Sequence, residues 1–382
     1  MSNEFDDIRP YSEEEFPKIM QRLKKSPYLI DTLRRIQWPR CPFILRWAAN
    51  LLIKGFIYWH LRDIKTRNDF QQKLIIDKFM HWIIKNTTEG LSFSGHEKLR
   101  KDTAYLYISN HRDIVLDVAF LTCAVIDAKL PFIEIAIGDN LLLNQFVEDL
   151  IRINRSFIVR RNLPPREQIG ASLKLSRYIN HSLNQGNSIW IAQREGRAKD
   201  GRDVTNPAVL KMVYMSERKT VKNFSEYVNK INIVPVSISY ELDPLDNLKA
   251  WELYRKENRG GHTKRKHEDL VSMYFGIKGM KGRVHLNFGE PLRGDFTNDK
   301  AVAEALDNFI SRNYKLWPTN YIAYDTVHET DRFSSEYDEA QKTQFLNRFK
   351  YLPSAVRKIV LATYAVAVEK MLHHEEEERA GS

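Results

Sequence analysis

The sequence predicts an α/β protein with a mostly parallel sheet flanked by helices and with helical extensions at both ends. Short apolar segments typical of strands alternate with longer helical segments over about residues 90–295. Before that range the apolar residues are densely spaced with few turn signals, and from about residue 299 the chain is helical again. We therefore expect a helical N-terminal region (1–90), an α/β domain (91–295) and a C-terminal helical extension (296–382).

Within the α/β range, β-rich apolar runs that end at turn residues predict six strands, at 103–109, 132–138, 156–160, 188–193, 232–240 and 283–289. Helical segments are expected at 114–129, at 140–151 with Asp139 as its N-cap, and at 165–186, and a last helix near 353–373. The stretch 255–267 is basic and loop-like, and the acidic run Glu375–Glu378 indicates a solvated end. Pro235 lies inside a predicted strand, which indicates an edge strand or a local break in the ladder.

Composition limits the class of protein. The 382 residues are 43% hydrophobic, which is enough for a sizeable core and excludes global disorder. A formal net charge of +10 favours an anionic partner, which can be a nucleic acid, an anionic membrane surface or a phosphorylated substrate. The two cysteines, Cys41 and Cys123, lie far apart and form neither a disulfide framework nor a metal-ligand pattern, so we expect a reducing cytosol. The acidic, polar start predicts no secretory signal.

The segment Phe43–Leu61 comes nearest to a transmembrane helix, although no uninterrupted apolar run is long enough to predict one. Its polar residues Arg46, Asn50 and Lys54 recur at every fourth position and form one narrow stripe. This pattern fits a helix in the membrane interface with Trp47, Phe56 and Trp59 as anchors, and equally a core helix with one wet edge.

The first motif with chemical potential is SNHRDIVLDVAFL, residues 109–121, at a strand-to-helix junction. His111 can accept a proton near pH 7, and an aspartate within reach would fix its tautomer. Asp113 and Asp117 are both candidates for that partner. The alternative is that Asn110 or Asp113 merely caps the helix and His111 is incidental.

Two further motifs place cations where strands end, which is where ligand sites gather in open α/β sheets. Arg160 and Arg161 leave the strand at 156–160, and their planar forks suit a phosphate, although an exposed basic turn fits as well. At most one of these neighbours is expected to face a given pocket.

The third motif is IAQREGRAKDGRD, residues 191–203, where a strand ends in Glu195-Gly196-Arg197 and Lys199 follows. These residues would form an anion site beside a carboxylate, and a charged surface loop is the alternative. The order of residues differs from that of a phosphate-binding P-loop.

In order, NHRDIVLD, FIVRR, REGRAK and IVPVSISYE resemble the four blocks of the glycerolipid acyltransferase superfamily, and KGRVHLNFGEPL resembles the segment that commonly follows them. The resemblance covers about residues 90–295. It implies an enzyme of phospholipid biosynthesis in which His111 is a general base, with Asp117 as its partner or Asp113 as second choice. It also implies acceptor-binding roles for Arg160, Arg161, Glu195, Gly196, Arg197 and Lys199, and supporting roles for Asn110 and Pro235.

Two spacings depart from the family pattern. Five residues separate His111 from Asp117, where the family has four, and within one regular helix the extra residue would rotate the side chain by about 100°. The insertion must therefore be absorbed in the loop before the helix, or Asp113 must serve. Arg197 follows Glu195 by two positions rather than three, and Lys199 could substitute for it.

The resemblance further implies acyl-carrier protein or acyl-CoA as co-substrate, no bound cofactor, no metal and no covalent acyl-enzyme. We expect a peripheral or monotopic protein at the cytoplasmic face of the membrane, with a lysolipid or polyol-phosphate acceptor and no nucleic acid. An amino-acid-linked lysolipid or another non-glycerol compound is the alternative acceptor. The other class of explanation is a non-enzymatic basic protein that binds nucleic acid or membrane; no helix-turn-helix, RNA-binding or zinc pattern supports it.

Overall fold

The computed structural model describes residues 4–161, 163–258 and 268–381. The chain forms two compact units: unit 1 comprises Met1–His81 and Glu134–Tyr178, and unit 2 comprises Trp82–Ile133 and Ile179–Ser382. This division differs from the three ranges expected from the sequence, because the middle of the chain contributes to the same unit as the N-terminal helices.

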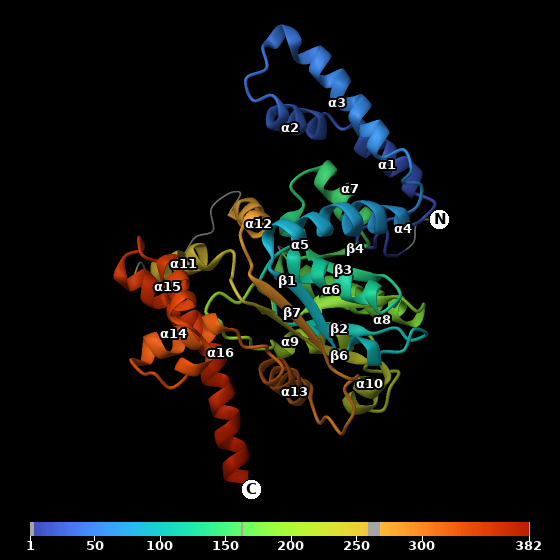
Figure 1. Cartoon of the computed structure of the whole chain (residues 1–382). Coiled ribbons are helices and arrows are strands. Elements are labelled where there is room, and N and C mark those ends of the chain that lie inside the picture. The colour runs from blue at the N-terminus through green and yellow to red at the C-terminus, as the bar shows by residue number, and fades with distance from the viewer. Residues whose placement is uncertain (1–3, 162, 259–267, 382) are drawn as a thin grey trace. The chain divides into compact units, whose positions relative to one another are not determined.

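Unit 1 is mainly helical and contains two strands. Its elements are α1 (Phe16–Lys25), α2 (Pro27–Gln37), the 3₁₀ turn η1 (Phe43–Leu45), α3 (Arg46–His60), α4 (Arg67–Asp69), the π-helix η2 (Phe70–Met80), β3 (Ile133–Gly138), the 3₁₀ turn η4 (Asp139–Leu141), α7 (Gln145–Ile153) and β4 (Ser156–Val159). Helix α8 (Pro165–Asn184) starts in unit 1 and continues into unit 2. Helices α2 and α3 lie side by side (Figure 1).

The core of unit 1 joins segments far apart in the sequence. Phe16 and Met20 of α1 are buried in one cluster with Phe70 and with Ile153 of α7. Beside this cluster the buried carboxylate of Asp149 accepts a hydrogen bond from a tyrosine hydroxyl 2.9 Å away and forms an ion pair with an arginine of α1. Strands β3 and β4 pair in parallel, with Gly138 opposite Val159.

Unit 2 contains five neighbouring strands in the order β1-β7-β6-β2-β5. They are β1 (Gly90–Ser94), β2 (Leu106–Ser109), β5 (Ser188–Ala192), β6 (Ile233–Tyr240) and β7 (Arg283–Phe288). The pairs β1–β7, β2–β6 and β2–β5 are parallel, and only β6–β7 is antiparallel among these neighbours. The predicted α/β class with a mostly parallel sheet is confirmed.

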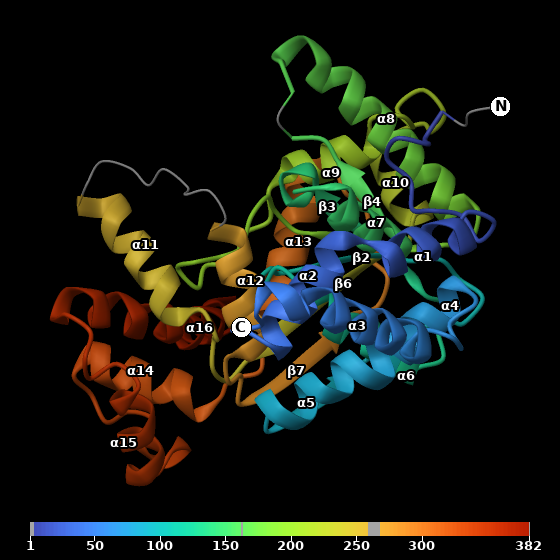
Figure 2. The same ribbon diagram turned by 90° about the horizontal axis from the view of Figure 1, so that it is seen from above.

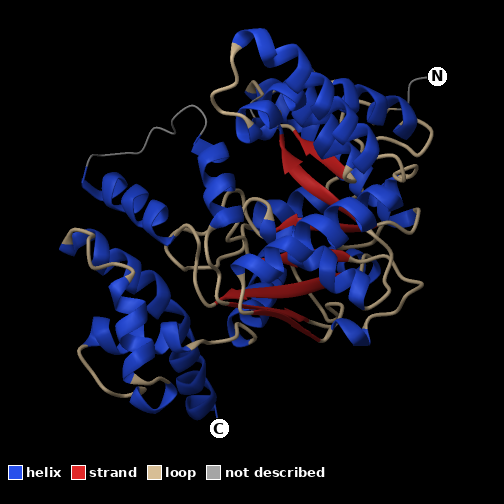
Figure 3. Cartoon of the chain, turned by 45° about the horizontal axis from the view of Figure 1, so that its top comes forward, coloured by secondary structure: helices blue, strands red, loops and turns tan. Residues whose placement is uncertain are grey.

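Helices lie on both faces of these strands, as Figure 3 shows with strands in red. The hydroxyl of Ser237 donates to a carbonyl of α13, whereas Tyr240 packs against Phe120 of α6. Because alternate residues of a strand point to opposite faces, α6 and α13 cover opposite faces of β6. Every residue of β6 is buried, as expected for a strand that is covered on both faces.

The remaining elements of unit 2 are mostly helices. They are α5 (His81–Thr87), η3 (His96–Lys98), α6 (Leu116–Asp127), α9 (Pro207–Tyr214), α10 (Phe224–Lys230), α11 (Asp246–Asn258), α12 (Glu268–Lys278), α13 (Asp299–Arg312), α14 (Pro318–His328), η5 (Ser334–Glu336), α15 (Glu339–Asn347) and α16 (Ser354–Gly381). Helices α11, α14, α15 and α16 form a separate group with its own apolar core (Figure 2).

Several expectations about single elements need correction. Asp139 does not cap the helix expected at 140–151, because α7 begins only at Gln145 and Asn144 caps it by accepting the N–H of Val147 at 3.1 Å. Strand β1 was not expected at all. The last helix is longer than expected, because α16 continues through the acidic run to Gly381, and the exposed Glu378 of that run forms an ion pair with Arg312.

Pro235 does not lie on an edge strand, because β6 has neighbours on both sides. The paired register with β7 begins at Val236, one residue after the proline. The N–H that Pro235 lacks therefore falls just outside the β6–β7 ladder. Of the two expectations for this proline, an edge strand and a local break in the ladder, the structure fits the local break.

Candidate active site

Asn110, the first residue after β2, extends the sheet with its side chain. It is fully buried, its Oδ1 accepts the N–H of Ile238 at 2.8 Å, and its Nδ2 donates to the carbonyl of the same residue at 3.0 Å. Nδ2 also lies 3.2 Å from Oδ2 of Asp203. The side chain thus bonds to β6 as a further backbone residue would, and it fixes the position at which the chain leaves the strand.

His111 comes directly after this fixed point, and its partner is Asp117. Nδ1 of His111 lies 2.9 Å from Oδ2 of Asp117, which is completely buried in the first turn of α6. An ionised carboxylate can only accept, so Nδ1 carries the proton and Nε2 has the free lone pair. Among the described residues Nε2 has no hydrogen-bond partner, so this imidazole can accept a proton from a bound molecule.

The spacing problem is resolved in the loop before the helix. Helix α6 begins at Leu116, so the extra residue lies in the irregular segment between His111 and the helix, and Asp117 still reaches the imidazole. Asp113 has a different task. Its Oδ1 accepts the N–H groups of Val115 and Leu116, each at 2.8 Å, and so caps the start of α6.

The carboxylate of Asp117 has four donors. Oδ2 accepts the N–H groups of Arg112 at 2.6 Å and Asp113 at 2.9 Å in addition to His111, and Oδ1 accepts the hydroxyl of Tyr240 at 2.7 Å. Burial acts to raise the pKa of Asp117, but the hydrogen bond and charge of His111, with the other donors, outweigh it and lower the pKa.

The pKa of the neighbouring Asp113 is raised, whereas that of Asp117 is lowered. Burial raises its pKa first, and the negative charge of Asp117 raises it further. Its Oδ2 is buried without a hydrogen-bond partner among the described residues. One of the two aspartates is therefore held as the anion beside the histidine, while the other resists ionisation.

The loop after β5 brings the third motif to the same unit. Glu195 and Gly196 are exposed, and Gly196 has φ +74°, a conformation that side chains other than glycine's rarely adopt. Arg197 is half-buried, and its guanidinium donates to the hydroxyl of Ser272 at 3.3 Å. The next residue, Ala198, donates its N–H to the carbonyl of His111 at 2.8 Å, which places this loop directly beside the histidine.

Lys199 turns away to an ion pair with Glu252 of α11. Gly201 packs so tightly on α16 that an added Cβ would lie 2.4 Å from the carbonyl oxygen of Thr363. The C-terminal helices therefore support the far end of this loop.

Arg160 and Arg161 follow β4 in unit 1, and both are exposed. The guanidinium of Arg161 lies across Gly138 at the end of β3, where an added Cβ would be 2.8 Å from its Cζ. The backbone N–H of Arg161 lies 3.3 Å from Oδ1 of Asp139. Glycine at this strand end is thus what allows the arginine side chain to lie flat over the backbone.

Sequence reasoning gave no role to Tyr240 and Arg112. Burial and the charge of Asp117 raise the pKa of Tyr240 well above its usual value, so the hydroxyl stays protonated and donates to that aspartate. The guanidinium of Arg112 is paired with the buried Asp203 at 2.6 Å and donates to the carbonyl of Gly201 at 3.2 Å. The end of a strand was the only available signal for Tyr240.

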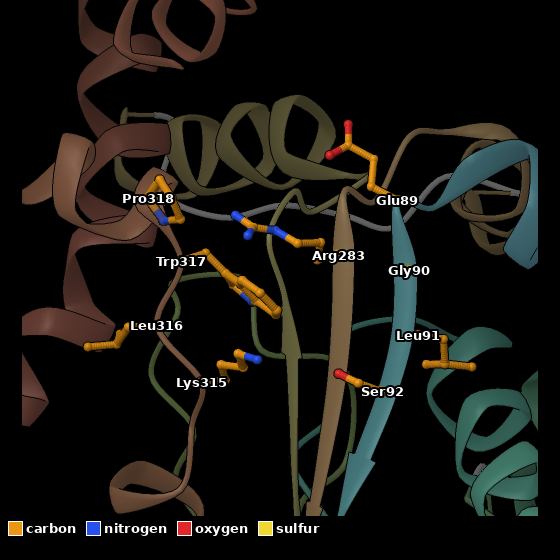
Figure 4. A pocket seen from close by; sticks show the side chains of 9 residues that line it. All are labelled: Glu89, Gly90, Leu91, Ser92, Arg283, Lys315, Leu316, Trp317 and Pro318. Atoms are coloured by element: carbon orange, nitrogen blue, oxygen red, sulfur yellow. The ribbon is translucent and has the colours of Figure 1, made fainter. Parts of the chain in front are cut away.

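A cavity of about 330 Å³ opens beside the starts of β1 and β7 (Figure 4). Trp317 lies between Arg283 and Lys315 there, with the two cations 4.7 Å and 4.8 Å from the ring centroid. Arg283 is held by two hydrogen bonds to Glu241. None of the predicted site residues lines this cavity, which is lined by Glu89, Gly90, Leu91, Ser92, Arg283, Lys315, Leu316, Trp317 and Pro318.

Comparisons with known proteins find acyltransferases. Residues 90–239 match the family model described as "Acyltransferase". The chain is 22% identical over 264 residues to the glycerol-3-phosphate acyltransferase of Pasteurella multocida, covering 68% of this chain and 29% of the relative. It is 24% identical over 272 residues to that of Pseudomonas aeruginosa, covering 68% and 31%. The chain thus spans less than a third of the length of these curated relatives.

Among solved structures, the 1-acyl-sn-glycerophosphate (LPA) acyltransferase of Thermotoga maritima aligns with 77% of this chain and 92% of its own, at 14% identity and a TM-score of 0.39. That likeness is too low to bear on the fold or the function. The family match covers the His111 motif, both later motifs and most of β6. Residues 90–239 thus match an acyltransferase family model, and the chain is similar over about two thirds of its length to glycerol-3-phosphate acyltransferases.

Proposed function

We propose that the protein is a membrane-associated O-acyltransferase of phospholipid biosynthesis. It would move a fatty acyl group from acyl-CoA or acyl-acyl-carrier protein to the hydroxyl of glycerol-3-phosphate, lysophosphatidate or a related lysolipid. The observation that carries the proposal is the imidazole of His111, bonded at Nδ1 to the buried Asp117 and open at Nε2, within the family-matched domain. The relatives named as glycerol-3-phosphate acyltransferases support the choice of acceptor.

In the proposed reaction, Nε2 of His111 takes the proton of the acceptor hydroxyl while the oxygen attacks the thioester carbonyl carbon. The tetrahedral intermediate then collapses, the C–S bond breaks, and the imidazolium returns the proton to the thiolate. Asp117 stabilises the imidazolium and holds the proton on Nδ1. This route needs no bound cofactor and no covalent acyl-enzyme.

Cationic side chains would bind the acceptor. Arg197 is the first choice, because it lies in the loop beside His111 and makes only one hydrogen bond among the described residues. Lys199 is a weaker candidate, because it is already paired with Glu252. The remaining predicted contributors to acceptor binding are Arg160, Arg161, Glu195 and Gly196.

The membrane association that we propose rests on α3. Its large side chains point away from the protein: Trp47 is 67% exposed, Phe56 54% and Trp59 60%, whereas only small or β-branched residues of this helix are buried. A core helix would show the reverse pattern, so the interfacial alternative fits better. Among the described residues, no helix is both long and apolar enough to cross a bilayer.

The test is acyl transfer by the purified chain, using radiolabelled acyl-CoA or acyl-carrier protein and each acceptor in turn. Glycerol-3-phosphate, lysophosphatidate and an amino-acid-linked lysolipid cover the alternatives. We expect labelled product with a phosphate-bearing acceptor. If the chain only hydrolyses the thioester, or transfers the acyl group to none of the three acceptors, the proposal is contradicted. If it acylates only the amino-acid-linked lysolipid, that compound replaces the phosphate-bearing acceptor in the proposal.

A further inference from the structure

Helix α12 exposes its large apolar side chains to solvent, whereas a helix that packs on a core would bury them. Its buried residues are Ser272 and Gly276, one turn apart. Its outer face carries Leu270, Val271, Tyr274 and Phe275, with Tyr274 60% and Phe275 48% exposed. An amphipathic helix normally buries its large apolar side chains, and an exposed row of them marks a surface that binds something apolar.

The small inner residues allow α12 to lie directly on the His111 motif. A Cβ added to Gly276 would lie 2.2 Å from Oδ2 of Asp113, and Ser272 accepts a hydrogen bond from Arg197. The end of the helix is anchored by the completely buried Lys281, whose Nζ donates to the carbonyls of Ile277 at 3.2 Å and Gly279 at 2.6 Å. The helix is therefore fixed beside the site with its apolar face outward.

A lysine lies on the same face as these apolar side chains. Lys278, on the same exposed face, has its Nζ 4.7 Å from the ring centroid of Trp82, which is itself 39% exposed. The chain as a whole has a formal net charge of +10, and residues 259–267 of its basic stretch lie outside the described residues. Exposed apolar and aromatic side chains on a chain with an excess of cations are complementary to the interface of a bilayer that contains anionic lipids.

We propose that the outer face of α12, residues 270, 271, 274 and 275, docks on an anionic phospholipid surface. This surface is separate from that of α3 and belongs to the unit that contains His111. For its use in catalysis the inference rests on the proposed function: docking at α12 would let a lysolipid reach the imidazole without leaving the interface. Docking itself is measured without any catalysis.

The test labels one position of the 382-residue chain with an environment-sensitive nitrobenzoxadiazole dye. Cys41→Ser and Cys123→Ala provide the background, Tyr274→Cys carries the dye, and Tyr351→Cys is the matched control. Tyr351 is 88% exposed and lies between α15 and α16. Vesicles of phosphatidylglycerol mixed with phosphatidylcholine are compared with vesicles of phosphatidylcholine alone.

We expect the emission of the dye at residue 274 to shift to shorter wavelength with the anionic vesicles, and the control dye to stay unchanged. No shift at residue 274 would overturn the inference. A dye that is already shifted without vesicles would mean that the chain itself covers the face. A shift that grows with protein concentration would mean that a second copy of the chain covers the face. Either of these two results would also overturn the inference.

A variant with Tyr274→Ser and Phe275→Ser adds a second readout. Its affinity for anionic vesicles should fall by about tenfold or more, since two partly inserted aromatic side chains are lost. Transfer to lysophosphatidate in vesicles should fall about tenfold further than transfer from a short-chain acyl-CoA to soluble glycerol-3-phosphate. Equal losses with the two acceptors would overturn the inference. If the unaltered chain acylates neither acceptor, the proposed function fails, while the dye still decides docking.

Discussion

Replacement of Asp117 by asparagine tests the acid–base pair with little disturbance of the fold. The two backbone N–H groups that point at Oδ2 should hold the amide oxygen of the asparagine in that position, so Nδ1 of His111 keeps its acceptor. The amide nitrogen then faces the hydroxyl of Tyr240, which can rotate and accept. Tautomer and geometry are therefore preserved, and the variant loses mainly the negative charge.

The expected loss follows from that charge. Two unit charges 4 Å apart at an effective dielectric constant of 20 interact by about 4 kcal/mol, which is an upper limit for stabilisation of the imidazolium. A charged hydrogen bond exceeds a neutral one by about 1–1.5 kcal/mol, which is the lower limit. We therefore expect kcat/KM to fall by about tenfold to a thousandfold.

The assay is release of the free thiol from acyl-CoA, followed with a thiol-reactive dye in the presence of glycerol-3-phosphate. The matched control is Asp113→Asn, which keeps an acceptor for the two N–H groups that it caps and leaves the imidazole untouched. We expect near-normal kcat/KM for the control. The assignment of the two aspartates would be refuted if Asp117→Asn kept full kcat/KM. It would also be refuted if kcat/KM fell as far in Asp113→Asn as in Asp117→Asn.

Three further variants test the surroundings of the site. Tyr240→Phe removes one hydrogen bond to a buried carboxylate and should lower the free energy of unfolding by about 1.5–3 kcal/mol in urea titrations; no change would show that the hydroxyl contributes nothing. Gly276→Ala brings a Cβ against Asp113 and should destabilise by about 1–3 kcal/mol, whereas Gly170→Ala, with open space around it, should stabilise by up to about 1 kcal/mol. Equal effects of the two would contradict the close packing. Burial lowers the pKa of Lys281 to about 8 from the usual 10.5, so the unfolded chain binds more protons between these values. Between pH 8 and pH 10.5 the free energy of unfolding of the unaltered chain should therefore rise by about 3 kcal/mol more than that of Lys281→Met. If the free energy of unfolding depends on pH in the same way in both proteins, the pKa shift is refuted.

The sheet and the order of the motifs could be predicted because both depend on local patterns. Short apolar runs that end in polar residues gave most of the strands, and strand ends gave the positions of His111 and Glu195. Strand β1 was missed because Gly90–Ser94 contains only two apolar residues and is supported by its pairing with β7, almost two hundred residues later.

The partner of His111 could be narrowed to two aspartates but not chosen. The choice depends on where α6 begins, and one residue in an irregular loop decides that. The role of Tyr240 was out of reach for a similar reason. Only the pairing of β6 with β2 brings its hydroxyl to Asp117, and no local pattern records that pairing.

The exposed faces of α3 and α12 show a different limit. An apolar stripe has the same periodicity whether it faces a core or a bilayer, so the sequence left both alternatives open for Phe43–Leu61. The two alternatives are distinguished by the residues on the helix face opposite the apolar stripe. In α12 the buried residues are a serine and a glycine, and their role can only be recognised once the contact with Asp113 is known.

The measurement that tests the central claim most directly is acyl transfer by His111→Ala beside the unaltered chain, with labelled acyl-CoA and glycerol-3-phosphate. Far-ultraviolet circular dichroism and urea unfolding should show that the variant is folded. If Nε2 of His111 is the general base, product formation should fall by about a hundredfold or more, in line with the usual contribution of general-base catalysis. Undiminished transfer by the folded variant would contradict the account.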